Sequence, residues 1–419
     1  MDWFLGTFTL LLGFYMAWNI GANDVANAMG TSVGSKALTL KKAIYLAAIL
    51  EFSGAFLMGS HVSETIQTGI INPSMFAEDP MVFVLGMMSS LLATGILLQI
   101  ASYFALPVST THALIGAIAG FGLIIGGVDA IFWSQIAAIA ASWVISPILS
   151  GILSYFLFGF IQKKILSSLS PSEAMQKFLP LWAFAVSFSL FATLLRGGIP
   201  QLHIECSLFT SLSIAGAFGL IAFLGSFKLV GFMTKSESIS SSQLSQAIAL
   251  EKTEKIFVLL QIFSACLIAF AHGANDVANA IGPVAAVLSV IKTHSLQLHS
   301  STPLWLLALG GGGIVIGLAT WGWRVIETIG KKITELTPSR GFSAEFSAAI
   351  TILIASKIGL PISSTHALVG AVLGVGLTRG LQALNLRMLR EIALSWIVTI
   401  PLCALISILC FYVLRLFIY

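Results

Sequence analysis

Charged side chains are scarce in this sequence. Only 9% of its 419 residues are Asp, Glu, Lys or Arg, against about a quarter in soluble domains. Hydrophobic residues make up 57%, and the mean hydropathy is +0.97. Apolar stretches long enough to cross about 30 Å of hydrocarbon recur along the chain, and the alternating segments of a membrane β-barrel are absent. The sequence therefore predicts an all-α, multi-pass protein of the cell membrane (plasma or inner membrane).

Cysteine is also rare. The four cysteines show neither metal-ligand spacing nor a disulfide framework. The net charge of +4 is small and forms no concentrated basic patch, so we expect no nucleic-acid partner. We expect no resident cofactor either. The N-terminal stretch MDWFLGTFTLLLGFYMAW lacks the basic start and cleavage site of a signal peptide, which indicates a retained first helix.

Two polar motifs each occur twice. GANDVANA at 21–28 returns unchanged at 273–280, and LPVSTTHALIGA at 106–117 returns as LPISSTHALVGA at 360–371. Both motifs keep their order at nearly the same offset, which indicates a duplication. We divide the chain into repeat 1 (1–160), connecting spans with a polar cytoplasmic linker (161–254, the linker being 228–254), and repeat 2 (255–419).

Lys and Arg near the ends of apolar segments orient the two repeats. The loop after the first motif carries Lys36, Lys41 and Lys42, which places it in the cytoplasm, whereas loop 61–80 has no Lys or Arg. In repeat 2 the order is reversed, because loop 292–303 has a single Lys and the next loop is basic. The charges therefore predict two repeats of inverted topology, with both termini outside.

The segments around the second motif are expected to form hairpins. In repeat 1 these segments are 81–104 and 108–126, and the loop charges fit if the pair leaves the membrane on the side from which it entered. The same holds in repeat 2. The prediction is eight full spans plus two re-entrant helical hairpins, or about 12 helical membrane segments. The full spans lie near 3–28, 43–60, 131–160, 181–195, 206–227, 256–286, 304–324 and 391–414.

The hairpin tips suit an oxyanion. Pro107 and Pro361 disfavour helix at the preceding residue, so the hydroxyl residues that follow stand at the start of a new helix. Free N–H groups, hydroxyls and the positive end of the helix dipole meet there. The six hydroxyl residues are Ser109, Thr110, Thr111, Ser363, Ser364 and Thr365.

The duplicated aspartates point to a cation. Asp24 and Asp276 lie in apolar segments, where a carboxylate is costly and normally marks an ion or proton path. Hard oxygen donors surround them and thiolates are absent, which favours Na⁺ or a proton over copper or zinc. Cation and anion would then neutralise each other, which is the basis of symport. The neighbouring amides are Asn23, Asn27, Asn275 and Asn279.

The paired GANDVANA and PVSTTHA/PISSTHA motifs resemble those of the inorganic phosphate transporter (PiT) family, and the resemblance covers nearly the whole chain. It implies a secondary transporter, not an enzyme, that imports inorganic phosphate with Na⁺ or H⁺ by alternating access. By motif match, the cation site would consist of Asp24, Asn27, Asp276 and Asn279, the two aspartates being direct ligands if the ion is Na⁺. Phosphate would be held by the six hydroxyl residues, Asn23 and Asn275.

The sequence leaves several alternatives open. Sulfate shares the tetrahedral geometry of phosphate, and two carboxylates could also serve an intramembrane aspartyl hydrolase. His112 and His366 either brace the tips or act in transport. For His272 we favour a local structural role, and Glu51 is either proton-linked or paired. The expected partners are phosphate, Na⁺ or H⁺ and the lipid bilayer, with a homodimer as an option.

Overall fold

The computed structural model describes residues 2–196, 206–234, 242–296, 302–326, 336–380, 382 and 386–418. Helices make up nearly all of these ranges, and the β pairing within them is a single bridge between Ile71 and Ile131. The predicted all-α class is therefore confirmed. The main helices are α1 (Asp2–Gly34), α2 (Leu40–Met58), α3 (Ser60–Thr68), α4 (Pro80–Tyr103), α5 (Thr110–Phe121), α6 (Trp133–Ile161), α7 (Pro171–Leu195), α8 (Leu208–Thr234), α9 (Ser242–Thr293), α10 (Leu304–Thr320), α12 (Pro338–Lys357), α13 (Ser364–Leu377) and α14 (Leu386–Ile418).

Short helical turns connect some of these elements. They are η1 (Pro73–Phe76), the π-turn η2 (Gly122–Gly126), η3 (Val128–Ala130) and the π-turn η4 (Gln162–Leu166).

Seven of the described helices are long and apolar enough to cross a membrane, and α2 with α3 counts as an eighth span if the bent pair is taken as one. The bend between α2 and α3 is 61°. The segment expected as loop 61–80 therefore begins with a helix, whose residues Val62, Ser63 and Ile66 are buried. Helix also covers both ends of the predicted linker 228–254, because α8 continues to Thr234 and α9 begins at Ser242. The count of 12 segments stays a prediction.

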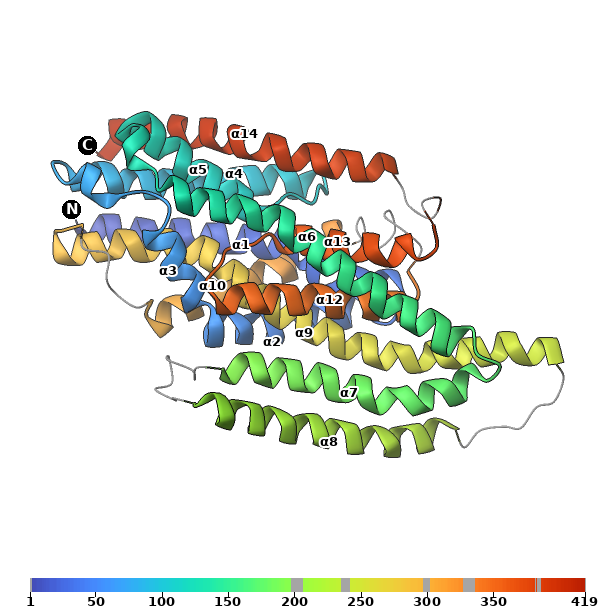
Figure 1. The fold of residues 1–419 in the computed structure, drawn as a ribbon. Coiled ribbons are helices and arrows are strands. Elements are labelled where there is room, and N and C mark those ends of the chain that lie inside the picture. The colour runs from blue at the N-terminus through green and yellow to red at the C-terminus, as the bar shows by residue number, and fades with distance from the viewer. Residues whose placement is uncertain are drawn as a thin grey trace.

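The two motif helices run in opposite directions. In Figure 1, α1 runs from the end marked N toward the other end of the molecule, and α9 runs back. The hairpin of α4 and α5 opens toward the end that holds both termini, and the hairpin of α12 and α13 opens toward the opposite end. These directions agree with the inversion expected from the loop charges.

Both hairpin tips are built in the same way. At the end of α4, Leu106 N–H donates to the Ala101 carbonyl at 2.9 Å and Ala105 N–H to Ser102 at 3.1 Å. The end of α12 repeats both bonds with the same distances, between Leu360 and Ala355 and between Gly359 and Ser356. These bonds form a Schellman motif, whose C′ residue takes positive φ, here 53° at Ala105 and 71° at Gly359. Proline follows in each case, and this combination ends the helix at the tip.

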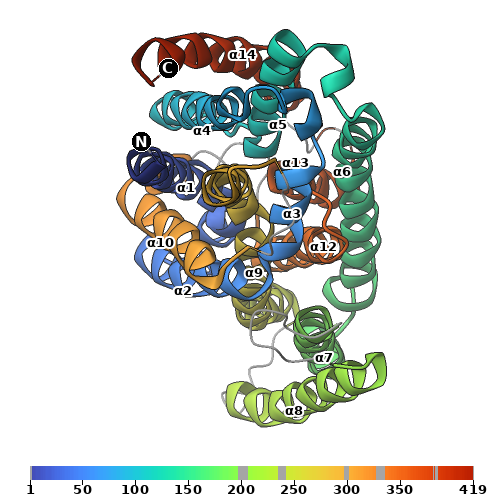
Figure 2. The same cartoon turned by 90° about the vertical axis from the view of Figure 1, so that its left-hand side faces the viewer.

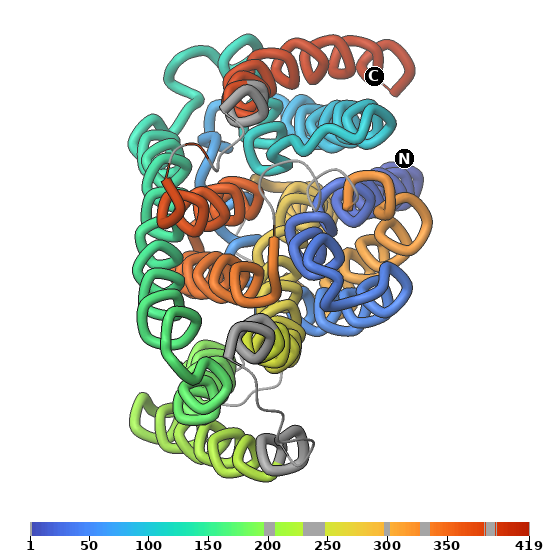
Figure 3. The backbone as a smooth tube through the Cα atoms, turned by 90° about the vertical axis from the view of Figure 1, so that its right-hand side faces the viewer, coloured from blue at the N-terminus to red at the C-terminus, as the bar shows by residue number. Residues whose placement is uncertain are grey.

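The last long helix of each repeat braces the hairpin of the other repeat. α6 packs along α13 and α12, and α14 along α5 and α4; Figure 3 shows α6 beside the second hairpin. Ser150 and Ser154 of α6 donate to the carbonyls of Ala367 and Ala371, both at 2.6 Å. The pair α7 and α8 lies at the edge of the molecule (Figure 2), with α7 against α9.

Candidate functional site

The motif helices pass close to their neighbours because each motif begins with glycine. A Cβ on Gly21 would collide with the Ile314 carbonyl of α10, and one on Gly273 with the Glu51 carbonyl of α2. The backbones therefore pack directly against each other at these points. From Ile20 to Ser32, α1 is buried without interruption, so the polar side chains of the motif face the protein interior.

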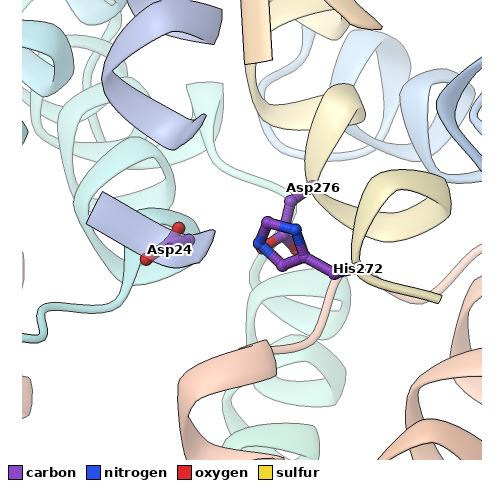
Figure 4. Close-up of side chains that lie close together, drawn as sticks. All are labelled: Asp24, His272 and Asp276. Atoms are coloured by element: carbon purple, nitrogen blue, oxygen red, sulfur yellow. The ribbon is translucent and has the colours of Figure 1, made fainter. Parts of the chain in front are cut away.

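Asp24 of α1 faces Asp276 of α9 (Figure 4). Both are 1% exposed, and carboxylate oxygens of the two residues lie within 4.8 Å of each other and of His272. Each carboxylate is bound by the start of its own repeat's second hairpin helix: the Thr110 hydroxyl donates to Asp24, and the Ser364 hydroxyl donates to Asp276 at 2.8 Å. The structure thus brings together motifs that lie more than 80 residues apart in the chain.

The second asparagine of each motif reaches the tip of the other repeat. Asn27 donates to Thr365 Oγ1 at 2.8 Å, and Asn279 donates to Thr111 Oγ1 at 3.4 Å. The Oδ1 atom of Asn279 is buried and accepts no hydrogen bond from any described residue. We call these two aspartates, two asparagines and four tip residues the central site: Asp24, Asn27, Asp276, Asn279, Thr110, Thr111, Ser364 and Thr365.

The first asparagine of each motif contacts the end of the hairpin's first helix. Asn23 Nδ2 donates to Ser102 Oγ and to the Leu106 carbonyl, both at 3.1 Å. In repeat 2 the Asn275 amide lies 3.0 Å from Ser356 Oγ. These side chains fasten the tips to the motif helices.

Ser109 and Ser363 are helix N-caps. Their Oγ atoms accept from the backbone N–H of His112 at 3.3 Å and of His366 at 3.2 Å. Such caps satisfy one of the free N–H groups of a helix start. The remaining free N–H groups of α5 and α13 belong to helix starts at the central site, where the positive ends of the two helix dipoles face the carboxylates.

One feature breaks the symmetry of the two halves. His272 contacts Asp276 Oδ2 through Nε2 at 2.8 Å and Glu51 Oε1 through Nδ1 at 3.3 Å, and both His272 and Glu51 are fully buried. The position before the first motif holds Ile20 instead. The sequence marked His272 and Glu51 as polar residues but did not predict their pairing, which depends on the packing of α2 against α9.

A fourth buried carboxylate was not singled out from the sequence. Glu345 of α12 is 0% exposed and accepts four hydrogen bonds from α1 and α9. Its only signal is an acidic residue inside an apolar helix. The donors are Thr31 and Ser32 at 2.6 Å, Ser264 at 2.6 Å and Gln261 at 3.1 Å.

His112 and His366 lie behind the tips. Their rings are 4.4 Å apart. His112 Nδ1 lies 3.3 Å from the Trp396 carbonyl of α14, and His366 Nδ1 lies 3.0 Å from the Trp143 carbonyl of α6. Each histidine thus joins its hairpin to a helix of the opposite repeat, which favours the bracing role over a direct role at the site.

A helical membrane protein in which two helix starts meet paired buried carboxylates has the architecture of a membrane transporter. A family model described as the phosphate transporter family matches residues 20–407. The chain belongs to this family, so it is a multi-pass phosphate transporter and not an enzyme. The hydrolase alternative is therefore excluded, and the sulfate alternative is not favoured.

Individual relatives agree with the family assignment. The chain is 47% identical to the chloroplastic inorganic phosphate transporter 2-1 of Arabidopsis thaliana, with 96% of this chain and 70% of the relative covered. It is 46% identical to a putative phosphate permease of Chlamydia pneumoniae, with 97% and 98% covered. A solved structure of a sodium-dependent phosphate transporter superposes with a TM-score of 0.90 at 38% identity, covering 98% of this chain and 99% of that one.

Proposed function

We propose that the protein imports phosphate across the cell membrane by symport with Na⁺, with alternating access to the central site. Repeats 1–160 and 255–419, joined by 161–254, would move against each other around it, with both termini outside. The observation that carries the proposal is that two helix starts suited to an anion are hydrogen-bonded directly to two buried carboxylates.

The charges at this site call for a bound cation. Among the described residues, the ion-pair partner of Asp276 is His272, and Asp24 has none within ion-pair distance. Two carboxylates and a phosphate in one buried site would repel each other strongly in a low dielectric. Co-bound cations remove that repulsion, so each ion raises the affinity for the other.

The available ligands fit Na⁺. Asp24 and Asp276 would be its direct ligands, with Asn27 and Asn279 beside them, and oxygen donors suit a hard cation. The unpaired Asn279 Oδ1 is the kind of buried acceptor that such an ion would satisfy. The structural neighbour described as sodium-dependent supports Na⁺ over H⁺.

Phosphate would lie against the hairpin tips. Backbone N–H groups of Thr110, Thr111, Ser364 and Thr365, and the Thr365 hydroxyl, would donate to its oxygens. The hydroxyls of Thr110, Ser364 and Thr111 would donate to phosphate only after turning from Asp24, Asp276 and the Ile362 carbonyl. Asn23 and Asn275, with the capping residues Ser109 and Ser363, complete the set that we assign to phosphate.

Uptake into proteoliposomes tests the proposal. Radiolabelled phosphate is offered with an inward Na⁺ gradient, an inward H⁺ gradient or no gradient, with and without excess sulfate. We expect concentrative uptake only with the Na⁺ gradient, little competition by sulfate, and loss of uptake in Asp24→Asn and in Asp276→Asn. Asp129→Asn, at an exposed position, is the matched control. Concentrative uptake without Na⁺, or full activity of both site variants, would refute the cation-site assignment.

A further inference from the structure

A polar pocket lies outside the central site, between α3 and the tip of the second hairpin. It has a volume of about 350 Å³. Its lining consists of His61, Glu64, Thr65 and Thr68 of α3 and of Lys357 to Gly359 at the tip. Figure 2 shows α3 near the middle of the face that holds both termini. The absence of Lys and Arg from 61–80 predicts that this face is outside.

Lys357 gives the pocket its positive charge. It is the last residue of α12 and is partly buried, and no described residue forms an ion pair with it. Arg196, at the end of α7, lies close enough for its charge to act on Lys357. The equivalent position of the first hairpin is the uncharged Tyr103. The lysine in this pocket is therefore a feature of one tip and not of the fold in general.

Glu64 supplies a hydrogen-bond acceptor in the same pocket. The two threonine hydroxyls are already used, because Thr65 donates to the Gly359 carbonyl at 2.6 Å and Thr68 donates to the Glu64 carbonyl at 2.9 Å. An oxyanion in the pocket would therefore meet the Lys357 ammonium, the His61 ring and a carboxylate. Phosphate near neutral pH retains a proton that it can donate to that carboxylate, whereas sulfate has none.

The pocket and the central site lie on the same short tip. Gly359 lines the pocket and contacts α3. Ile362, three residues later, accepts a hydrogen bond from Thr111 at 3.0 Å, and Ser364 binds Asp276. Five residues along the chain thus separate Gly359 in the pocket from Ser364 in the central site, so an ion that passes this tip would move from the pocket to the central site.

We propose that this pocket is an outer recruitment and selectivity site for phosphate, in which Lys357 attracts the oxyanion and Glu64 favours one that carries a proton. The proposal rests on the proposed phosphate import. A cation at the mouth of a site raises the rate of anion encounter without taking part in later steps. The charge of Lys357 is therefore expected to affect the KM for external phosphate and not the maximal rate.

The test is the initial rate of Na⁺-driven phosphate uptake by intact cells over a range of phosphate concentrations. We expect Lys357→Gln to raise KM about tenfold at an unchanged maximal rate, and Lys357→Arg to restore KM. The increase should shrink at high ionic strength, where surface charge is screened. Lys292→Gln, an exposed lysine at the end of α9, is the control and should leave KM unchanged. For Glu64→Gln we expect stronger inhibition by sulfate.

A chemical variant covers the case in which Lys357→Gln reaches the membrane poorly. Lys357→Cys is modified in the same cells with a positively or a negatively charged thiol reagent, and only the positive reagent should lower KM. An unchanged KM in Lys357→Gln, an equal increase in Lys292→Gln, or the same KM after both reagents would overturn the proposal. If the unmodified protein shows no Na⁺-driven uptake at all, the proposed function itself fails.

Discussion

Gly273 is a position at which a single methyl group should disturb transport. A Cβ at residue 273 would stand 2.7 Å from Glu51 Cα and closer still to the Glu51 carbonyl, whereas carbon atoms in contact are separated by about 3.5–4.0 Å. Both opposing atoms belong to the backbone of α2, so no side-chain rotation relieves the clash. Gly273→Ala must therefore move α9 away from α2 by about 1 Å.

The consequence is expected at Asp276, one turn further along α9. Overpacking of this kind costs about 1–3 kcal/mol of stability, and a displacement of about 1 Å at a reacting group can lower a rate 100-fold. We expect Gly273→Ala to insert into the membrane but to lose at least about tenfold in the initial rate of Na⁺-driven phosphate uptake. Protein in the membrane is quantified in parallel, so that the rate is expressed per molecule.

Gly312→Ala is the matched control for this experiment. Gly312 also lies in an apolar helix, α10, but a Cβ there meets no atom of the described part of the chain within 4 Å. This variant should transport normally. A Gly273→Ala protein with normal uptake would show that α9 and α2 can separate without disturbing the carboxylate, and the close-packing argument would then be wrong.

Three further predictions concern stability, measured as the midpoint of thermal unfolding in detergent. His272→Ile leaves Glu51 buried without its partner and should lower the free energy of unfolding by about 3–5 kcal/mol. The double variant with Glu51→Leu should recover most of this loss. A double variant as unstable as His272→Ile alone would contradict the pairing. Glu345→Ala leaves the buried donors of Thr31, Ser32 and Gln261 without their acceptor, whereas Ser264 can still donate to the Gln261 carbonyl. The loss of stability should be about 3 kcal/mol, so an unchanged midpoint would argue against this hydrogen-bond cluster. The left-handed backbone conformation at residues 105 and 359 penalises a Cβ by about 1 kcal/mol. Gly359→Ala should therefore lower the midpoint and Ala105→Gly should raise it. Unchanged midpoints in both variants would show that these two residues do not adopt the left-handed conformation.

Much of the central site could be predicted from the sequence because the two repeats carry the same letters at the same offset. The duplication identified Asp24 and Asp276, and proline followed by hydroxyl residues identified the tips. Thr110 and Ser364 do meet those aspartates. Each inference needed only the neighbouring residues in the sequence. The aspartates are conspicuous because apolar segments do not tolerate a charge without a function, and the tips are conspicuous because proline ends a helix.

Contacts that depend on helix packing could not be predicted. The partner of Glu51 is known only once α2 is placed against α9, and the four donors of Glu345 come from α1 and α9. The helix α3 was missed because most of its side chains are polar, although Val62, Ser63 and Ile66 are buried. Hydrophobic pattern shows that a side chain must be covered, but not which helix covers it.

Each repeat supplies contacts that complete the other repeat. Each carboxylate is bound by its own repeat's tip, but Asn27 reaches Thr365 and Asn279 reaches Thr111 of the other repeat. The bracing helices are exchanged as well, since α6 supports the second hairpin and α14 the first. One repeat alone would therefore leave its asparagine, its tip threonine and its hairpin without their partners. Neither repeat contains a complete central site, and a displacement of one tip changes the contacts of its own repeat's aspartate and of the other repeat's asparagine.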